Sequence, residues 1–348
     1  MCLKVPHIHI NPTEYCLTFE SRFTGDRSPK GYVALEEEES DASREAKKPK
    51  PSLCVVCLGT LQHCYMASRL DLVVEEMGNS GYDATHFSLS LSLPICLSMR
   101  QHSLWLHLEK RLPASCLSGL FQKDVVPIKQ VWKYIFPDLV AERVSLQHQT
   151  GDVTDFFVEL AVEWKGEDEE LGAMIHICKD EYATRAKNVH VYNMGVFSRQ
   201  GVEKSLENVS MQQFMKYYPV PPIEPDDTFD LTIKMFRNSS FLGGRYCKYS
   251  RELPQTPWII NGVRKCETSL EEVIGGPIQQ FLGATEVRFL ASGREDVDVR
   301  MLGSGRPFAF ECVNPKKTRL SKEETENLTK LINCQHEGVR IINTTALT

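Results

Sequence analysis

Two aspartates and three arginines lie close together in the C-terminal part of the sequence. Residues 293–308 read Gly-Arg-Glu-Asp-Val-Asp-Val-Arg-Met-Leu-Gly-Ser-Gly-Arg-Pro-Phe, which places Asp296 and Asp298 among Arg294, Arg300 and Arg306. A guanidinium beside a carboxylate favours the ionised form of the acid, and an ionised aspartate can act as a nucleophile. Arginine can also hold a phosphate with two parallel hydrogen bonds. An ion-paired turn without chemistry would have the same composition.

Two other interpretations of this segment fail on spacing. A calcium loop would need an oxygen ligand where Arg300 stands and a glutamate to close it. A dinucleotide fingerprint would need its glycines before a helix, whereas Gly303-Ser-Gly305 precedes an expected strand.

A second segment, residues 243–258, alternates cations with aromatic residues. Its cations are Arg245, Lys248 and Arg251, and its aromatic residues are Tyr246, Tyr249 and Trp258. Cations bind phosphates, and aromatic rings stack on exposed bases. If the segment is a strand, Arg245 and Tyr249 share one face, and Tyr246 and Lys248 share the other. The alternative is a strand with packed tyrosines and cations that extend to the surface.

Cys54 and Cys57 form a single CxxC pair, with Cys64 seven residues further on. Such a pair supplies two of the four thiolates of a structural zinc site. A redox dithiol and two buried thiols are the other interpretations. No second CxxC pair accompanies it in the sequence.

The elements that must position residues 293–308 are predicted from periodicity and capping residues. A strand is expected at 286–291 and another at 307–313, with the charged loop between them. Ser269 with Glu272, and Ser321 with Glu324, are spaced as capping boxes. They predict a helix from Leu270 and a second helix to about Asn333, followed by a short strand at 339–342.

The rest of the chain predicts an α+β protein in three parts. Residues 1–52 contain the charge runs Glu36–Glu39 and Lys47–Lys50 and are expected to be disordered. Residues 53–225 predict mixed α/β structure, with helices at 61–77, 99–112 and 126–143, strands at 87–93 and 156–164, and helical parts in 187–218. Four prolines within Pro219–Pro225 predict a domain border. Residues 226–348 begin with a strand at 229–235.

Composition is that of a soluble globular protein. The chain has 348 residues, of which 42% are hydrophobic and 25% charged. Without an apolar run of 18 residues, no membrane span is expected. The twelve cysteines indicate reduced thiols or metal ligands. Net charge is −6, but residues 237–319 carry a local balance of +4, which is compatible with a phosphate-binding segment.

Together, the two charged segments resemble the archaeal and eukaryotic tRNA pseudouridine-54/55 synthases, the tenth family of pseudouridine synthases. The resemblance rests on Gly244-Arg-Tyr, Lys248-Tyr-Ser-Arg, Leu253-Pro-Gln-Thr-Pro-Trp-Ile259, Gly293-Arg-Glu-Asp-Val-Asp-Val-Arg300, Leu302-Gly and Gly305-Arg-Pro-Phe308. Cys54-Val-Val-Cys57 resembles one of that family's two zinc-binding pairs.

The resemblance implies a THUMP-containing RNA-binding domain at 53–225 and the N-terminal part of a pseudouridine synthase catalytic domain at 226–348. Asp296 matches the catalytic aspartate, and no cofactor takes part in catalysis. Arg294 is expected to be the ion partner of Asp296 or a group that fills the space left in the base stack. The RNA contacts would be Arg245, Tyr246, Lys248, Tyr249, Arg251, Arg294, Arg300 and Arg306. Cys54 and Cys57 would be half of a structural zinc site.

Two functions therefore follow from the resemblance. One is isomerisation of uridine in the T-arm of tRNA by a monomer found in nucleus and cytoplasm. The other is an inactive RNA-binding or adaptor protein that serves primary microRNA and its processing complex. Because the family's catalytic domain extends past the position matched by Thr348, the 348 residues alone are expected to bind tRNA weakly and to show no isomerase activity.

Overall fold

The computed structural model describes residues 53–111, 122, 125–149, 154–182, 195–226 and 229–347, so the prediction for residues 1–52 lies outside the described part. Contacts group these residues into two compact units. Unit 1 holds the described residues up to Glu76 with Leu89–Ser145 and Glu159–Lys234, and unit 2 holds Met77–Ser88, Leu146–Val158 and the residues from Met235 onward. None of the described helices is both long and apolar enough to cross a membrane.

Helices and strands mix along the chain, which confirms the predicted α+β class. Up to Arg237 the described elements are α2 (His63–Asn79), β1 (His86–Ser92), α3 (Cys96–Arg111), α4 (Ile128–Val144), β2 (Gln147–His148), β3 (Phe156–Glu163), α5 (Glu167–Ile177), α8 (Arg199–Glu207), α9 (Met211–Tyr217) and β4 (Asp230–Arg237). The elements after it are β5 (Ser240–Lys248), β6 (Ile259–Ile260), β7 (Val263–Arg264), α10 (Leu270–Leu282), β8 (Glu286–Ala291), β9 (Met301–Val313), α11 (Lys322–Gln335) and β10 (Val339–Leu347).

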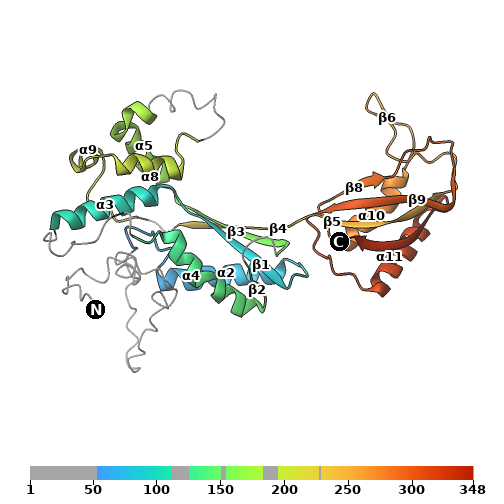
Figure 1. The fold of residues 1–348 in the computed structure, drawn as a ribbon, viewed down its shortest axis with the longest axis horizontal. Coiled ribbons are helices and arrows are strands. Elements are labelled where there is room, and N and C mark those ends of the chain that lie inside the picture. The colour runs from blue at the N-terminus through green and yellow to red at the C-terminus, as the bar shows by residue number, and fades with distance from the viewer. Residues whose placement is uncertain are drawn as a thin grey trace, which may run out of the picture. The chain divides into compact units, whose positions relative to one another are not determined.

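Helices α3, α5, α8 and α9 gather into one bundle in unit 1 (Figure 1). Their shared core includes Met99, Leu106, Met174, Val202 and Phe214. The sequence analysis did not predict α5. Its first turn consists of four acidic residues, Glu167–Glu170. They stabilise a helix N-terminus electrostatically, but they also make the hydrophobic periodicity of this short helix hard to recognise in the sequence.

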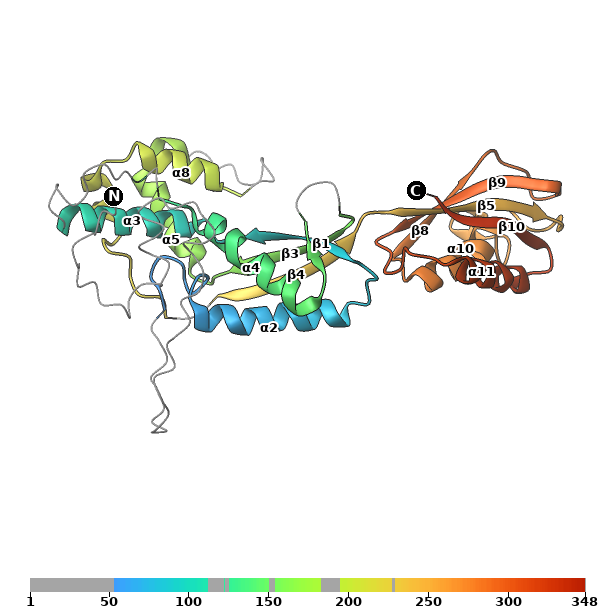
Figure 2. The same cartoon turned by 60° about the horizontal axis from the view of Figure 1, so that its bottom comes forward.

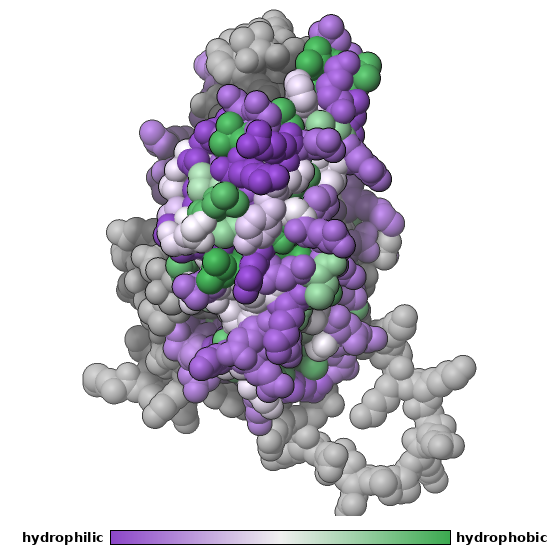
Figure 3. Space-filling view, turned by 90° about the vertical axis from the view of Figure 1, so that its right-hand side faces the viewer, coloured by the Kyte–Doolittle hydropathy of each residue, from purple (hydrophilic) through white to green (hydrophobic). Residues whose placement is uncertain are grey.

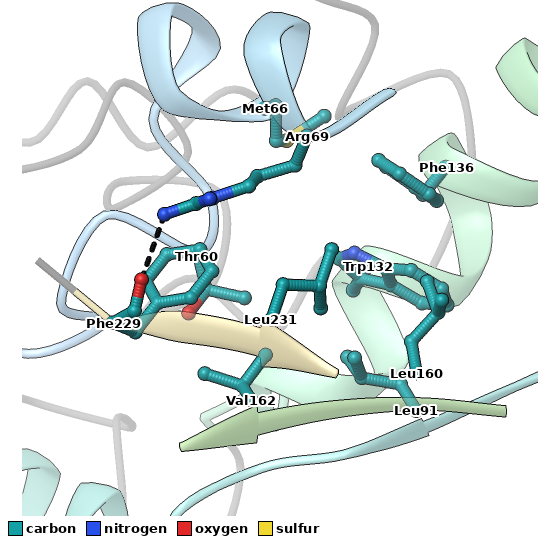
Figure 4. Close-up of a pocket in the computed structure, with 10 residues that line it drawn as sticks. All are labelled: Thr60, Met66, Arg69, Leu91, Trp132, Phe136, Leu160, Val162, Phe229 and Leu231. Atoms are coloured by element: carbon teal, nitrogen blue, oxygen red, sulfur yellow. Dashed lines mark hydrogen bonds between the residues drawn. The ribbon is translucent and has the colours of Figure 1, made fainter. Parts of the chain in front are cut away.

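A small cavity of about 20 Å³ lies between α2, α4 and the strands of unit 1 (Figure 4). Trp132, Phe136 and Leu160 give it mostly apolar walls. The guanidinium of Arg69 lies 5.0 Å from the ring centre of Phe229 and donates to the Phe229 carbonyl (2.7 Å). A volume of this size holds about one water molecule, so it is not a substrate site.

The proline-rich segment, predicted as a domain border, is part of unit 1. Ser103 donates to the Pro219 carbonyl (2.6 Å), and the buried Arg100 donates to the Ile223 carbonyl (3.1 Å). The division between the units falls after Lys234 instead. Proline restricts the backbone, but these hydrogen bonds fix the segment against α3 instead of leaving it as a linker.

The main sheet of unit 2 has the strand order β10-β5-β9-β8. Helices α10 and α11 lie side by side on one face of it (Figure 2). The core between them contains Ile274, Ile278, Phe310 and Ile332, each 0% exposed. The three strands predicted at 286–291, 307–313 and 339–342 are all present, but β9 begins at Met301 and β10 continues to Leu347.

Both predicted helix starts occur where the caps place them. The Ser321 hydroxyl accepts from the backbone N–H of Glu324, and the backbone N–H of Ser321 donates to the Glu324 carboxylate. The two hydrogen bonds form a complete capping box. Ser269 accepts from the N–H of Glu272, but that carboxylate bonds the Ser269 hydroxyl and Arg264 instead of the Ser269 N–H. Ser321 and Glu324 are therefore confirmed as a capping box, whereas Ser269 is confirmed only as an N-cap.

Candidate active site

The charged segment forms a loop, residues 292–300, that we call the Asp296 loop. It connects β8 to β9, whose pairing runs from Glu286 with Val313 to Ala291 with Phe308. Strand β9 starts at Met301, seven residues before Phe308, and its first residues pair with β5, where Met301 is opposite Lys248. This geometry brings the Asp296 loop to the end of β5, so the two charged segments of the sequence meet at one place.

Glu295 points into the protein and is the centre of a buried polar network. Its carboxylate accepts from the hydroxyl of Tyr246 at 2.9 Å to each oxygen. Gln255 donates to the same hydroxyl (2.8 Å) and to the Gly293 carbonyl (3.0 Å). Arg306 forms an ion pair with Glu295, with Nε 3.1 Å from Oε2. Burial, followed by the hydrogen bond and charge of Glu295, raises the pKa of Tyr246 although Gln255 opposes this, so the hydroxyl keeps its proton.

Lys248 lies on the other side of the same loop and is completely buried. Its ammonium group donates to the carbonyls of Leu253 (2.9 Å), Asp296 (3.0 Å) and Val297 (2.9 Å). An ammonium has three donors, and all three are used. Burial lowers the pKa of Lys248, while the carboxylates of Glu295, Asp298 and Asp296 act in the opposite direction.

Asp296 itself is exposed. No described lysine or arginine lies within 4.0 Å of its carboxylate, so the expected ion pair with Arg294 is wrong for the part of the chain described. Its neighbour Glu295 forms an ion pair instead, with Arg306. The arrangement offers an accessible carboxylate on a loop whose backbone is fixed, which suits a nucleophile or a base.

Comparisons with known proteins match both units. The family described as "Eukaryotic Pus10, N-terminal" matches residues 54–233, and the family described as "Pus10, C-terminal" matches residues 241–348. The chain belongs to the Pus10 family.

Relatives named "tRNA pseudouridine synthase Pus10" match most of the chain. The mouse protein is 35% identical over 89% of this chain and 57% of its own length, and the human protein is 36% identical over 86% of this chain and 55% of its own length. A protein of the same name from Thermofilum pendens is 48% identical over 23% of this chain. The chain thus spans just over half the length of its mammalian relatives.

Four of the eight residues predicted to contact RNA have internal roles in this Pus10 chain. Lys248 and Tyr246 are both 0% exposed, which corrects their assignment as contacts for phosphate and base. Arg245 donates to the carbonyls of Ser304 and Gly305, each at 2.7 Å. Arg306 pairs with Glu295 and donates to the Ser292 carbonyl (3.1 Å).

The other four predicted contacts remain accessible around the Asp296 loop. Arg251, Arg294 and Arg300 are exposed and form no ion pair with another described residue, and Tyr249 is 40% exposed. Figure 3 views the side of the molecule where Figure 1 labels β6 and shows a mostly hydrophilic surface with separate apolar patches, one of them at the top of the view. The β6–β7 hairpin carries exposed Ile259, Ile260 and Val263.

Cys54 and Cys57 are both completely buried in the turn that precedes α2. Within the described ranges, no group of three or more His, Cys, Asp or Glu side chains could hold a metal ion. Two thiols do not complete a tetrahedral zinc site. The residues that the structure describes therefore do not support the expected zinc.

The sequence analysis missed Glu295 and Gln255 as parts of the site. Glu295 stands between Arg294 and Asp296, so its type and neighbours give no sign that it alone is buried. One available signal was the alternation of an extended chain: if Asp296 faces solvent, then Glu295 faces the core. Gln255 lies within the second charged segment, residues 243–258, but nothing in its position there indicates a hydrogen-bond partner forty residues away.

Proposed function

We propose that this protein is a tRNA pseudouridine synthase in which Asp296 is the nucleophile and the target uridine lies at position 54 or 55 of the T-arm. The observation that carries the proposal is the accessible Asp296 carboxylate on a loop fixed by buried polar groups, within the segment matched by the Pus10 C-terminal family. The names of the mammalian relatives supply the substrate class.

The proposed reaction is an isomerisation, so atoms balance without a co-reactant or cofactor. The bond from ribose C1′ to uracil N1 breaks with help from the Asp296 carboxylate. The carboxylate either forms an ester with C1′, which breaks when C5 bonds to C1′, or removes a ribose proton that it returns at the end. The freed uracil turns, and a new bond forms from C1′ to C5. The proton originally on C5 is lost to solvent, and N1 gains one.

Access to a uridine within folded tRNA requires the base to leave its stack. Base flipping costs a few kcal/mol, which contacts to the flanking backbone and stacking on the base must offset. We assign the phosphate contacts to Arg251, Arg294 and Arg300, and base stacking to Tyr249. Their exposure around the Asp296 loop supports this assignment.

The same proposal divides the chain by role. Residues 53–225 would be the THUMP-containing RNA-binding domain, and residues 226–348 would be part of the catalytic domain. We place the protein in the nucleus and the cytoplasm, as a monomer that binds tRNA.

A second candidate function is an RNA-binding adaptor without catalysis, acting with primary microRNA and its processing complex. One observation favours it: among the described residues no cation neutralises Asp296, because Arg306 is taken by Glu295. Binding would then depend on the exposed arginines alone.

Tritium release from a tRNA transcript labelled at C5 of uridine separates the two functions. The enzyme tested is a hybrid in which this chain replaces the matching part of the mouse relative. Release by the hybrid, with pseudouridine mapped to position 54 or 55, supports the synthase. Binding of the transcript by the hybrid without release supports the adaptor. Failure to bind tRNA at moderate salt would contradict both.

A further inference from the structure

The Asp296 loop is anchored on both sides of Asp296 by groups that do not reach solvent. On the N-terminal side, the carboxylate of Glu295 is held by Tyr246 and Arg306, and its side chain is 1% exposed. On the C-terminal side, Lys248 holds the carbonyls of Asp296 and Val297. We propose that Glu295 and Lys248 are positioning residues that aim the Asp296 carboxylate at the substrate, an inference that rests on the proposed function.

The direction of Asp296 follows from the anchoring of its neighbour. Successive side chains of an extended segment point to opposite sides. Arg294 and Asp296 are exposed while Glu295 between them is buried, which is this alternation. Holding Glu295 inward therefore holds Asp296 outward. If Glu295 were released, the loop could rotate and the Asp296 carboxylate would lose its fixed orientation.

The chemistry of Glu295 argues against simple core filling. A buried carboxylate is costly unless it is paired and hydrogen-bonded. An apolar residue of similar size would fill the same space without that cost. Here the tyrosine hydroxyl reaches both oxygens, and Gln255 ties that hydroxyl to the Gly293 carbonyl of the same loop. The network thus fixes residues 293 and 295 to the end of β5.

Lys248 gives the second half of the argument. A lysine on the surface would satisfy no backbone group, whereas this one satisfies the carbonyls of three residues from two loops. Its bond to the Asp296 carbonyl restrains the peptide plane next to the nucleophile. The same carbonyl also accepts from the Val299 N–H (3.1 Å), which closes the turn after Asp296. Precise placement of a reacting group matters because a misplacement of about 1 Å can cost on the order of 100-fold in rate.

Two measurements test the proposal: hydrogen exchange of the 348-residue chain, and tritium release by a hybrid in which this chain replaces the matching part of the mouse relative. The variants are Glu295→Gln and Lys248→Met, with Glu326→Gln and Lys330→Met as matched controls on exposed positions of α11. We expect the exchange of the Ser292 and Val299 amides to accelerate in the two loop variants by at least about tenfold more than the exchange of amides inside β9 does. Tritium release should fall at least about tenfold with KM changed by less than about twofold.

Wild-type exchange in the loop of both variants would overturn the proposal, and so would equal acceleration in the loop and in β9, since that indicates general loss of stability. If either variant fails to fold, Tyr246→Phe removes only the hydroxyl that holds Glu295, and the same exchange criteria apply, with Tyr217→Phe as control. A parent hybrid that binds tRNA but releases no tritium would refute the proposed function alone, because loop exchange still decides whether the loop is held.

Discussion

Lys248 shows how one side chain can be decisive for stability at a position that sequence assigns to the surface. Its ammonium satisfies three carbonyls inside the protein. Lys248→Met keeps the length of the side chain but leaves those carbonyls without a donor, so we expect a loss of about 3 kcal/mol in the free energy of unfolding. Arg251→Met, at an exposed position nearby, should change it by less than about 0.5 kcal/mol. Urea unfolding measures both, and equal effects would contradict the assigned role.

At the residue scale, the sequence indicated a candidate site but not which of its cations are buried. Residue types and order indicated Asp296 and its arginines, and the structure brings the two charged segments together. Which cations are buried and which are exposed could not be predicted from the sequence, because Lys248 and Arg251 are only three positions apart in the same segment. Only the pairing of β5 with β9 and the fold of the two loops over Lys248 separate them.

Two glycines near the start of β9 differ in the space that an added Cβ atom would have. Gly303 and Gly305 both have positive φ, 69° and 73°. A Cβ at Gly305 would lie 2.6 Å from the Tyr246 carbonyl oxygen, whereas a Cβ at Gly303 meets nothing within 4 Å. We expect Gly303→Ala to cost about 1 kcal/mol from backbone strain alone, and Gly305→Ala to cost about 3 kcal/mol or more, since β5 must also move. Thermal melting of the two variants would refute this if their losses were equal.

At the element scale, local rules predicted what local interactions decide. The helix starts at Ser269 and Ser321 follow from capping residues within one turn. The length of β9 does not, because its first residues, Met301–Arg306, pair with β5 and not with the neighbour in sequence, β8. Helix α5 was missed because its acidic first turn outweighs its apolar positions in a search for periodicity.

Unit 2 is assembled from three separate stretches of the chain, and an ion pair between a buried arginine and a half-buried aspartate joins two of them. Arg237, 4% exposed, donates to Asp83 (2.6 Å), and Asp83 also accepts from the N–H groups of Thr318 and Arg319, each at 3.0 Å. Burial acts to raise the pKa of Asp83, but these hydrogen bonds and Arg237 outweigh it, so the pKa is lowered. A depressed carboxylate pKa stabilises the fold above the unfolded value, about 3.9, and this contribution is lost as pH falls further.

Asp83→Asn should therefore lower the free energy of unfolding by about 2 kcal/mol or more at pH 7, with a smaller difference from wild type at pH 3. Asp71→Asn is the matched control, since the Asp71–Arg143 pair is 66% and 50% exposed and such pairs contribute less than about 1 kcal/mol. Urea unfolding at both pH values measures the effect. A loss that is the same at pH 7 and pH 3 would contradict the assignment. No sequence pattern predicted this unit, because Asp83 and Arg237 are 154 positions apart.

Across the whole molecule, RNA affinity should depend on the exposed arginines of the Asp296 loop and its neighbour. Replacing Arg251, Arg294 and Arg300 by Gln should reduce the slope of log affinity against log salt by about 2 to 3, the counterions released at three phosphate contacts. Gln at the exposed Lys316, Lys322 and Lys330 removes the same charge and should change the slope by less than about 1. Equal slopes for the two triple variants would place the RNA elsewhere.

The most direct test of the central claim is the rate of tritium release by a hybrid in which this chain replaces the matching part of the mouse relative. The Asp296→Asn hybrid should release tritium at least about 1,000-fold more slowly than the parent hybrid, because the carboxylate acts in the chemical step. Its affinity for the tRNA transcript should stay within about twofold of the parent, since Asp296 is exposed and its side chain forms no ion pair with another described residue. Asp298→Asn in the same hybrid should have a milder effect. An Asp296→Asn hybrid that keeps the parental rate would contradict the assignment of Asp296 as the nucleophile.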